Sequence, residues 1–501
     1  MLGGKLGEVN REKAIGRLRT ERFDVLVIGG GITGCGVALD AASRGLKVGL
    51  LERNDFASGT SSKSSKLIHG GLRYLRQLQF KVTLEASREK ARLKQMAPHL
   101  VEDLPFLLPL WSRRARPMIS SGLWIYDAAA GFPKGLIHKH VDRKETLKLL
   151  PGLHADGLRG GFIYYDARAD DCRLVMHVAR KAALLGASLA NYLPATGFLK
   201  RAGRIAGVRT PQFDIVADRV VNASGVWCDE VRMTDDARAA HSVRASKGVH
   251  LVLRASRLPL RAAAMLPAAD NRIIFLIPTG DCTLVGTTDT DYFGPLSPLR
   301  AEPADIDYLL NVVNSNLPEA RLTRGDVLST YAGLRPLLLD GADVPSKASR
   351  EHHLFESPSG LLTITGGKLT TWRLMAKEVV DKLTRARCRT HLLDLFATDA
   401  RDSLSRRYGT EASSITDRTL LAEGLSHVWG EVDHAVESES AMTLSDVLCR
   451  RTRIALYAGD QGRSLALPVA QRMAKRLGWD PAEIARQRAA YEAELEANYP
   501  R

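Results

Sequence analysis

Three glycines early in the chain are spaced as in dinucleotide-binding sites. Gly29, Gly31 and Gly34 form the pattern G-x-G-x-x-G directly after an apolar run. The first glycine of such a pattern allows a tight turn, the second lets a pyrophosphate approach the backbone, and the third lets a helix pack closely on a strand. Glu52 ends the next apolar run, where a carboxylate can accept hydrogen bonds from ribose hydroxyls. These residues predict a nucleotide site; the alternative is an ordinary glycine-rich turn in an α/β domain.

The elements that must position these residues follow from the hydrophobic pattern. Residues 24–28 are a short apolar and β-branched run, which predicts a buried strand. Residues 32–44 carry apolar side chains at helical spacing, and residues 47–52 predict a second strand. A helix that begins at the fingerprint would direct its N-terminal amides and the positive end of its dipole at phosphate groups.

The segment from Thr60 to Leu75 has an unusual composition. It reads TSSKSSKLIHGGLRYL and combines hydroxyl side chains and small residues with two lysines, His69 and Arg73. An NAD-dependent Rossmann enzyme does not need such a segment. A flavin needs its pyrophosphate and its ring held along a long groove, where backbone amides and hydroxyls are expected. The segment therefore favours a flavin nucleotide.

This segment resembles the signature of the FAD-dependent, quinone-linked glycerol-3-phosphate dehydrogenases. Residues 222–225 (Asn-Ala-Ser-Gly) and 366–371 (Gly-Gly-Lys-Leu-Thr-Thr) are similar to two further motifs of that family. The resemblance implies an α/β fold with non-covalent FAD. Its expected parts are an N-terminal extension (1–20), a discontinuous Rossmann-type FAD-binding domain (20–100, 155–245 and 345–390), an antiparallel β-rich substrate or cap domain (100–155 and 246–344), and a C-terminal helical domain (395–501).

The resemblance also implies a reaction, the oxidation of sn-glycerol 3-phosphate to dihydroxyacetone phosphate. Arg73, Arg335 and Lys368 are the candidates for binding the phosphate and the substrate charge. His69 is the candidate base or hydroxyl-orienting group, because imidazole can take a proton near neutral pH, and Tyr74 adds a hydroxyl. The base stays open, since an arginine or lysine could instead stabilise an alkoxide. Arg335 could also be held by a structural aspartate rather than by substrate.

The implied FAD contacts come from four segments of the chain. They are Gly29, Gly30, Gly31, Ile32, Thr33, Gly34, Glu52, Arg53, Thr60, Ser61, Ser62, Ser65, Lys66, Leu67, Ala223, Gly225, Gly367, Lys368, Leu369 and Thr370.

The expected partners are glycerol 3-phosphate, a membrane quinone that receives the electrons, and an anionic membrane surface in peripheral contact; a homodimer is also compatible. Two other functions share these motifs in part. A glycerol-3-phosphate oxidase would pass the electrons to oxygen. A flavin-containing RNA-binding or RNA-modifying protein would share the fingerprint and the positive charge, but the basic residues form no concentrated stripe, so we expect no nucleic acid.

Charge and cysteine content narrow the cellular setting. The net charge of +15 favours anionic partners, and we expect the clusters at 113–116, 406–407 and 450–453 to be solvated surface. The six cysteines are scattered without a C-x-x-C pair, which argues against a zinc site or a disulfide framework and fits the cytoplasm. No apolar run reaches 18 residues, although a shallow interfacial contact near Trp111 and Trp124 is an option.

The remaining segments predict supporting elements. Residues 161–168 read as a strand that returns the chain to the α/β pattern, and residues 246–340 read as a separate antiparallel layer. Residues 446–453 and 481–498 are predicted as amphipathic helices of the C-terminal part.

Overall fold

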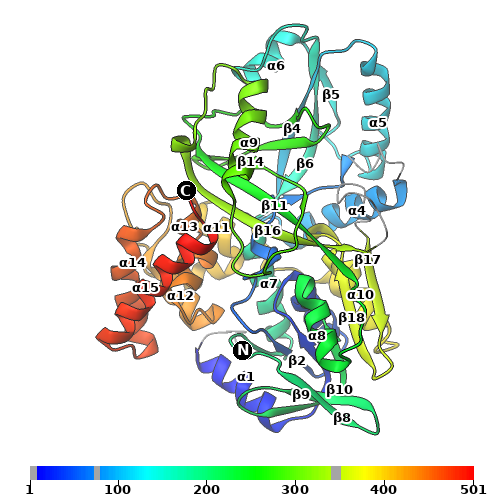
Figure 1. Cartoon of the computed structure of the whole chain (residues 1–501), viewed down its shortest axis with the longest axis vertical. Coiled ribbons are helices and arrows are strands. Elements are labelled where there is room, and N and C mark those ends of the chain that lie inside the picture. Colours follow the sequence, from blue (N-terminus) through cyan, green and yellow to red (C-terminus); the bar gives the residue numbers. More distant parts are fainter. Residues whose placement is uncertain (1–7, 73–78, 340–350) are drawn as a thin grey trace.

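A computed structural model describes residues 8–72, 79–339 and 351–501 (Figure 1). Its first sheet has the strand order β17-β18-β10-β1-β2-β7. The five strands from β18 to β7 in this order run parallel, and β17 is antiparallel to β18. The bounds are β1 (Phe23–Ile28), β2 (Val48–Leu51), β7 (Ser188–Ala190), β10 (Asp214–Asn222), β17 (His352–Glu356) and β18 (Leu361–Gly366).

Helices and a hairpin cover both faces of this sheet, which is why its strands are continuous apolar runs. Val25 and Val27 face a core shared with helices α2 (Ile32–Ser43), α7 (Asp171–Leu184) and α10 (Trp372–Asp381). Leu26 and Ile28 face the opposite core with Leu18 of α1 (Glu8–Thr20) and the hairpin of β8 (Gly197–Arg201) and β9 (Arg204–Arg209). The predicted Rossmann-type α/β architecture is thereby confirmed.

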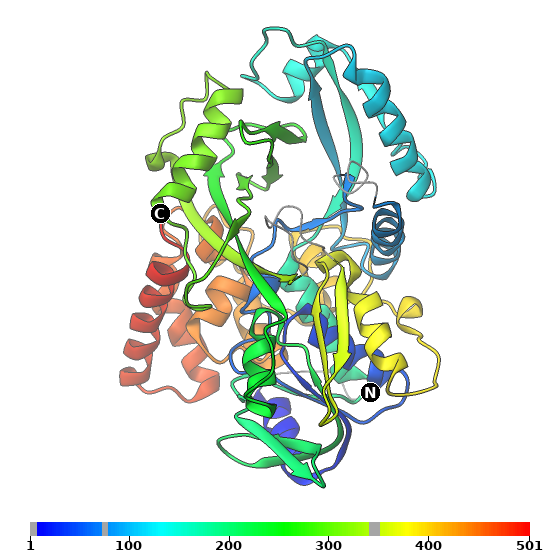
Figure 2. The ribbon, with the colours of Figure 1, turned by 45° about the vertical axis from the view of Figure 1, so that its right-hand side comes forward.

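The second sheet is larger and mainly antiparallel, with the order β15-β11-β14-β13-β12-β4-β6-β3, while β16 pairs with β11 and β5 pairs with β6. The bounds are β3 (Leu67–Ile68), β4 (Glu102–Leu110), β5 (Lys139–Val141), β6 (Gly160–Arg168), β11 (Val243–Arg254), β12 (Ala263–Pro267), β13 (Ile273–Thr279), β14 (Cys282–Gly286), β15 (Thr290–Asp291) and β16 (Val327–Leu338). Helices α4 (Phe80–Met96), α5 (Ala115–Ala129), α6 (Arg143–Leu149) and α9 (Pro303–Asn316) accompany it. Figure 2 shows α5 at the outer edge of this layer.

One strand belongs to a different layer from the one its sequence suggested. Residues 161–168 were expected in the FAD-binding part, but β6 pairs with β4 along its whole length in the second sheet. The strand's apolar pattern suits either sheet, so the partner is decided by tertiary packing rather than by the strand itself. The predicted domain boundaries as a set stay predictions.

The C-terminal part is helical, as expected, and packs beside β16 (Figure 1). Its helices are α11 (Ser403–Tyr408), α12 (Trp429–Glu439), α13 (Ile454–Tyr457), α14 (Arg463–Leu477) and α15 (Pro481–Asn498). The carbonyl of Pro500 accepts hydrogen bonds from both the amide (2.9 Å) and the hydroxyl (2.7 Å) of Thr330 on β16. The end of the chain is therefore attached to the second sheet.

The prediction for residues 446–453 was wrong. Residues Asp446–Arg451 form a π-helical turn, η7, that is buried on all sides. Arg450, Arg451 and Arg453, which we call the arginine cluster, are at most 7% exposed instead of lying in solvent. Periodicity placed charged residues on an outer face, but buried carboxylates from distant segments neutralise these arginines and allow their burial.

Candidate functional site

The glycine fingerprint forms the tight turn between β1 and α2. Gly29 has a φ of +114°, and a Cβ on it would lie 2.6 Å from the carbonyl oxygen of Ala223. A Cβ on Gly34 would lie 1.9 Å from the carbonyl oxygen of Gly29. Larger residues at either position would push strand and helix apart, so these glycines bring the N-terminus of α2 close to the ends of β1 and β10.

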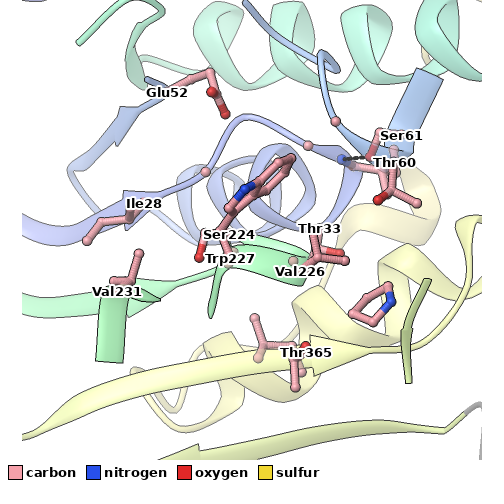
Figure 3. A pocket seen from close by; sticks show the side chains of 18 of the residues that line it. Ile28, Thr33, Glu52, Thr60, Ser61, Ser224, Val226, Trp227, Val231 and Thr365 are labelled. Atoms are coloured by element: carbon pink, nitrogen blue, oxygen red, sulfur yellow. Dashed lines mark hydrogen bonds between the residues drawn. The ribbon is translucent and has the colours of Figure 1, made fainter. Parts of the chain in front are cut away.

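The N-terminus of α2 faces a cavity and is held there by a serine from a distant segment. Ser61 Oγ accepts a hydrogen bond from the amide of Ile32 at 2.9 Å, shown as the dashed line in Figure 3. Gly31, Ile32 and Thr33 line the cavity. The backbone amides and dipole at this helix end suit a phosphate group.

Glu52 lies at the end of β2 and lines the same cavity. Its carboxylate accepts hydrogen bonds from the amides of Gly30 (2.7 Å) and Asn54 (2.8 Å), while burial raises its pKa. These two contacts fix the orientation of the side chain. Because a carboxylate offers about four acceptor positions, Glu52 can still accept from a ribose diol.

The cavity extends from the fingerprint toward both sheets. One end is lined by Ala195, Phe198 and Thr234, and the other by Pro336 and residues 366–369. The side chains of Trp227, Val231 and Thr365 also line it (Figure 3). This elongated shape, with glycine backbone at its middle, suits an extended dinucleotide.

Most of the residues predicted to contact FAD lie on this cavity. They are Gly29, Gly31, Ile32, Thr33, Glu52, Arg53, Thr60, Ser61, Ala223, Gly225, Gly367, Lys368 and Leu369. The others that were predicted are not among its lining residues: Gly30, Gly34, Ser62, Ser65, Lys66, Leu67 and Thr370.

Several of these seven have contacts within the protein. Lys66 is buried, with its ammonium 2.9 Å from the carboxylate of Asp171. The hydroxyl of Ser62 donates to the carbonyl of Gly59 at 3.3 Å, and Leu67 is buried in β3. These side chains support the loop between β2 and β3, whose other residues line the cavity, and their cofactor contacts stay predictions.

Sequence reasoning missed several lining residues. The guanidinium carbon of Arg53 lies 4.8 Å from the centroid of the Trp227 ring. A Cβ on Gly59 would lie 2.8 Å from the same indole. Phe198 of β8 and Val231 of the helix α8 (Cys228–Asp235) close the far end of the cavity. No motif marks these residues, although the tryptophan two positions after the 222–225 motif was a signal that could have been used.

The catalytic candidates that the structure describes come from segments surrounding one end of the cavity. The amide of His69 donates to the hydroxyl of Thr370 at 3.3 Å, two residues after Lys368. Lys368 and Pro336, the neighbour of Arg335, line the cavity together. Segments far apart in sequence thus meet there, and the catalytic roles of these residues stay predictions. Arg73 and Tyr74 lie outside the described residues.

Arg335 is oriented by neighbours in the turn that follows β14. Its guanidinium donates to the hydroxyl of Thr287 (3.0 Å), the carbonyl of Thr288 (3.2 Å) and the carboxylate of Asp289 (3.2 Å). Asp289 is the structural carboxylate that was the alternative partner. Because the side chain is still 21% exposed, the ion pair fixes its direction without fully burying it.

His250 is a second imidazole in this region that the sequence did not single out. Its Nε2 lies 2.8 Å from the hydroxyl of Ser65, and its ring stacks on Tyr331 at 4.7 Å. Burial, followed by the positive charges of Arg335 and Lys66, lowers its pKa to about 3. The imidazole is therefore neutral at physiological pH and is coupled electrostatically to the cationic candidates.

The arginine cluster fastens the C-terminal part to the loops of the cavity. The side chains of Arg450 and Arg451 both bind the carboxylate of Asp55, with nitrogen–oxygen distances of 2.6 and 2.7 Å. Arg453 binds Asp171 and also donates to the carbonyl of Ser62 at 3.1 Å. The cluster thereby holds both ends of the segment 55–62.

Comparison with known proteins identifies the family of the chain. The family profile described as FAD dependent oxidoreductase matches residues 24–381, and the profile described as the C-terminal domain of alpha-glycerophosphate oxidase matches residues 361–484. The chain is 41% identical over 535 residues to glycerol-3-phosphate dehydrogenase 2 of Mycobacterium tuberculosis, covering 98% of this chain and 91% of that protein. It is 34% identical to aerobic glycerol-3-phosphate dehydrogenase of Bacillus subtilis, covering 96% of each.

A solved structure extends the agreement to three dimensions. Glycerol-3-phosphate dehydrogenase from Bacillus halodurans complexed with FAD matches with a TM-score of 0.81 at 32% identity, covering 99% of this chain and 98% of that one. The similarity spans the cavity, the second sheet and the C-terminal helices alike. The chain therefore belongs to the family of FAD-dependent glycerol-3-phosphate dehydrogenases.

Proposed function

We propose that this protein oxidises sn-glycerol 3-phosphate to dihydroxyacetone phosphate and passes the electrons to a membrane quinone. One observation carries the proposal: the cavity beside the glycine fingerprint is also lined by Lys368 and by Pro336, the neighbour of Arg335. A nucleotide in the cavity would then adjoin cationic side chains. A phosphorylated three-carbon alcohol is a substrate that such an arrangement suits.

The residues present fit FAD. The fingerprint has no Cβ atoms where a pyrophosphate must approach, the start of α2 supplies amides, and Glu52 supplies ribose acceptors. FAD bound in this cavity would supply the acceptor for a hydride from C2 of the alcohol. We expect the binding to be non-covalent.

The side chains of the protein bind substrate and manage its proton. Arg335, oriented by Asp289, is assigned to the substrate phosphate, together with Lys368 and Arg73. His69 is assigned as the base that removes the proton of the C2 hydroxyl. His250 is not assigned to this task, because burial and the positive charges of Arg335 and Lys66 lower its pKa to about 3, which makes the imidazole a poor base.

The glycerol-3-phosphate oxidase is the second candidate function, favoured by the profile match of residues 361–484 to the oxidase C-terminal domain. Anaerobic mixing of the FAD-loaded protein with glycerol 3-phosphate tests the shared part: the flavin absorbance near 450 nm should disappear. Unchanged absorbance would contradict both functions. In air, rapid reduction of a quinone analogue with little peroxide supports the dehydrogenase, whereas stoichiometric peroxide supports the oxidase.

A quinone acceptor is dissolved in the membrane, so the enzyme that reduces it must reach the membrane surface. Among the described residues, no helix is long and apolar enough to cross a bilayer. We propose that the protein acts on the cytoplasmic side and contacts the membrane peripherally.

A further inference from the structure

The region around α5 exposes more large apolar side chains than a solvated surface normally does. Met118 is 71% exposed, Trp124 53% and Ile125 46%, and after the helix Phe132 is 51% and Ile137 39% exposed. The rings of Trp124 and Phe132 lie beside each other, with centroids 6.3 Å apart. Exposed clusters of large apolar side chains mark interaction sites on soluble proteins. We call residues 112–139 the α5 surface.

Helix α5 is apolar on two sides. Leu123 and Tyr126 are buried against the second sheet, while Met118, Ile125 and Ala128 point outward at helical spacing. A helix at the surface of a solvated domain normally has one apolar face and one polar face. Figures 1 and 2 both show α5 at the outer edge of the molecule, away from the C-terminal helices. The second apolar face therefore points away from the protein.

The charges of the α5 surface have one sign. Its lysines and arginines are all exposed: Arg113, Arg114, Arg116, Lys134 and Lys139. The one acidic residue between positions 112 and 139 is Asp127, which is buried and whose carboxylate lies 2.6 Å from Nδ1 of His138. The surface thus presents apolar and aromatic side chains among cations, with no exposed carboxylate of its own.

We propose that the α5 surface docks on the headgroup layer of an anionic lipid bilayer. Tryptophan side chains favour the boundary between headgroups and acyl chains, and basic residues beside them are attracted to anionic lipids. A surface that binds a second protein more commonly carries charges of both signs around its apolar centre. The proposal rests on the proposed function, because it identifies the surface through which a membrane-dissolved electron acceptor is approached.

The inner face of α5 connects this surface to the candidate active site. The hydroxyl of Tyr126 accepts a hydrogen bond from the amide of Gly70 at 2.8 Å and donates to Asp166 at 2.6 Å. Gly70 directly follows His69. One helix, about 10 Å thick, therefore separates the docking surface from the segment assigned to substrate, so docking would bring the substrate end of the cavity near the bilayer.

Vesicle binding tests the proposal. The FAD-loaded protein is sedimented with vesicles of phosphatidylcholine alone or mixed with phosphatidylglycerol, and we expect binding to the anionic vesicles. The patch variant reverses three cations: Arg113→Glu, Arg114→Glu and Arg116→Glu. The matched control reverses three exposed cations elsewhere: Arg238→Glu, Arg300→Glu and Arg321→Glu. Each cation removed from the docking surface should weaken binding at least about fivefold, whereas the control should bind nearly as the unaltered protein does.

A second pair of variants tests the apolar part. Trp124→Ser should weaken binding to the anionic vesicles, and Phe293→Ser, which changes a side chain that is 93% exposed elsewhere, should not. Fluorescence supplies a readout that needs no destabilising change: brominated lipids should quench the unaltered protein more than Trp124→Phe.

Some results would overturn the proposal. They are no binding of the unaltered protein to anionic vesicles, equal weakening in the patch and control variants, or self-association that Trp124→Ser abolishes while vesicle binding persists. Anaerobic flavin reduction by glycerol 3-phosphate is measured on the same samples. Because the α5 surface carries no residue assigned to substrate or FAD, bleaching should persist in the patch variant, so a failure of docking is distinguished from a failure of the proposed function.

Discussion

Replacing Asp55 by asparagine would remove the carboxylate that two buried arginines share. Arg450 and Arg451 bind it at 2.6–2.8 Å, and the amide of Asn191 donates to it at 3.2 Å. Although burial raises the pKa of Asp55, the charges of Arg451 and Arg450 hold it below its ordinary value. The carboxylate is therefore ionised at neutral pH and is a main source of negative charge at this site.

The expected loss of stability follows from the burial of the partners. The side chains of Asp55 and Arg451 are 0% exposed and that of Arg450 is 8% exposed. Breaking a buried ion pair by removing one partner typically costs about 3–5 kcal/mol, because the remaining charge is left without compensation in a medium of low dielectric. We expect Asp55→Asn to lower the free energy of unfolding by about this amount.

Urea unfolding followed by circular dichroism measures the loss, with Asp218→Asn as the control. Asp218 pairs with Arg22 at the surface, where the side chains are 45% and 66% exposed, so its removal should cost no more than about 1 kcal/mol. FAD affinity supplies a second readout, because the segment after Asp55 lines the cavity, and it should fall in the Asp55 variant only. A loss no larger than that of the control, with FAD affinity unchanged, would show that Glu439 and Asp446 suffice for the arginine cluster and would refute the reasoning.

Three further variants test the cavity. Arg335→Ala should raise the KM for glycerol 3-phosphate by roughly 10²–10³-fold, since charged hydrogen bonds to phosphate are lost, while FAD stays bound; an equal effect in Arg324→Ala, an arginine that pairs with Asp307 at the surface, would contradict this. Gly31→Ala should weaken FAD binding, because its Cβ would lie 3.1 Å from Ser61 Oγ, whereas Gly16→Ala, with open space around it, should not; equal FAD affinities would remove Gly31 from the site. His250 binds its proton only near pH 3 when folded, so the unfolded state holds more protons between pH 3 and 6.5 and stability is lost as the pH falls through that window. His250→Asn should flatten the dependence of unfolding free energy on pH by up to about 1.4 kcal/mol per unit, and an unchanged slope would show that the fold does not lower the pKa of His250.

The sequence by itself determined the nucleotide-binding half of this protein. Gly29, Gly31 and Gly34 act through backbone geometry within one turn, and Glu52 through its place at the end of the adjacent strand. Such features are local, so spacing alone reveals them. The segment around Thr60 and Ser61 was found through its composition and its resemblance to the family signature, whereas its position beside the N-terminus of α2 came only from the structure.

Only the tertiary structure decided which polar residues serve the site and which support it. Lys66 was predicted to contact the cofactor, and the fold pairs its buried ammonium with Asp171, a partner more than 100 residues away that spacing could not indicate. The sequence predicted that the arginine cluster lies in solvent, but ion pairs with the buried carboxylates of Asp55 and Asp171 allow its burial. Charge compensation depends on which segments meet in space rather than on spacing along the chain. The same is true of the surroundings of His250, whose partners are Ser65, just before β3, and Tyr331 on β16.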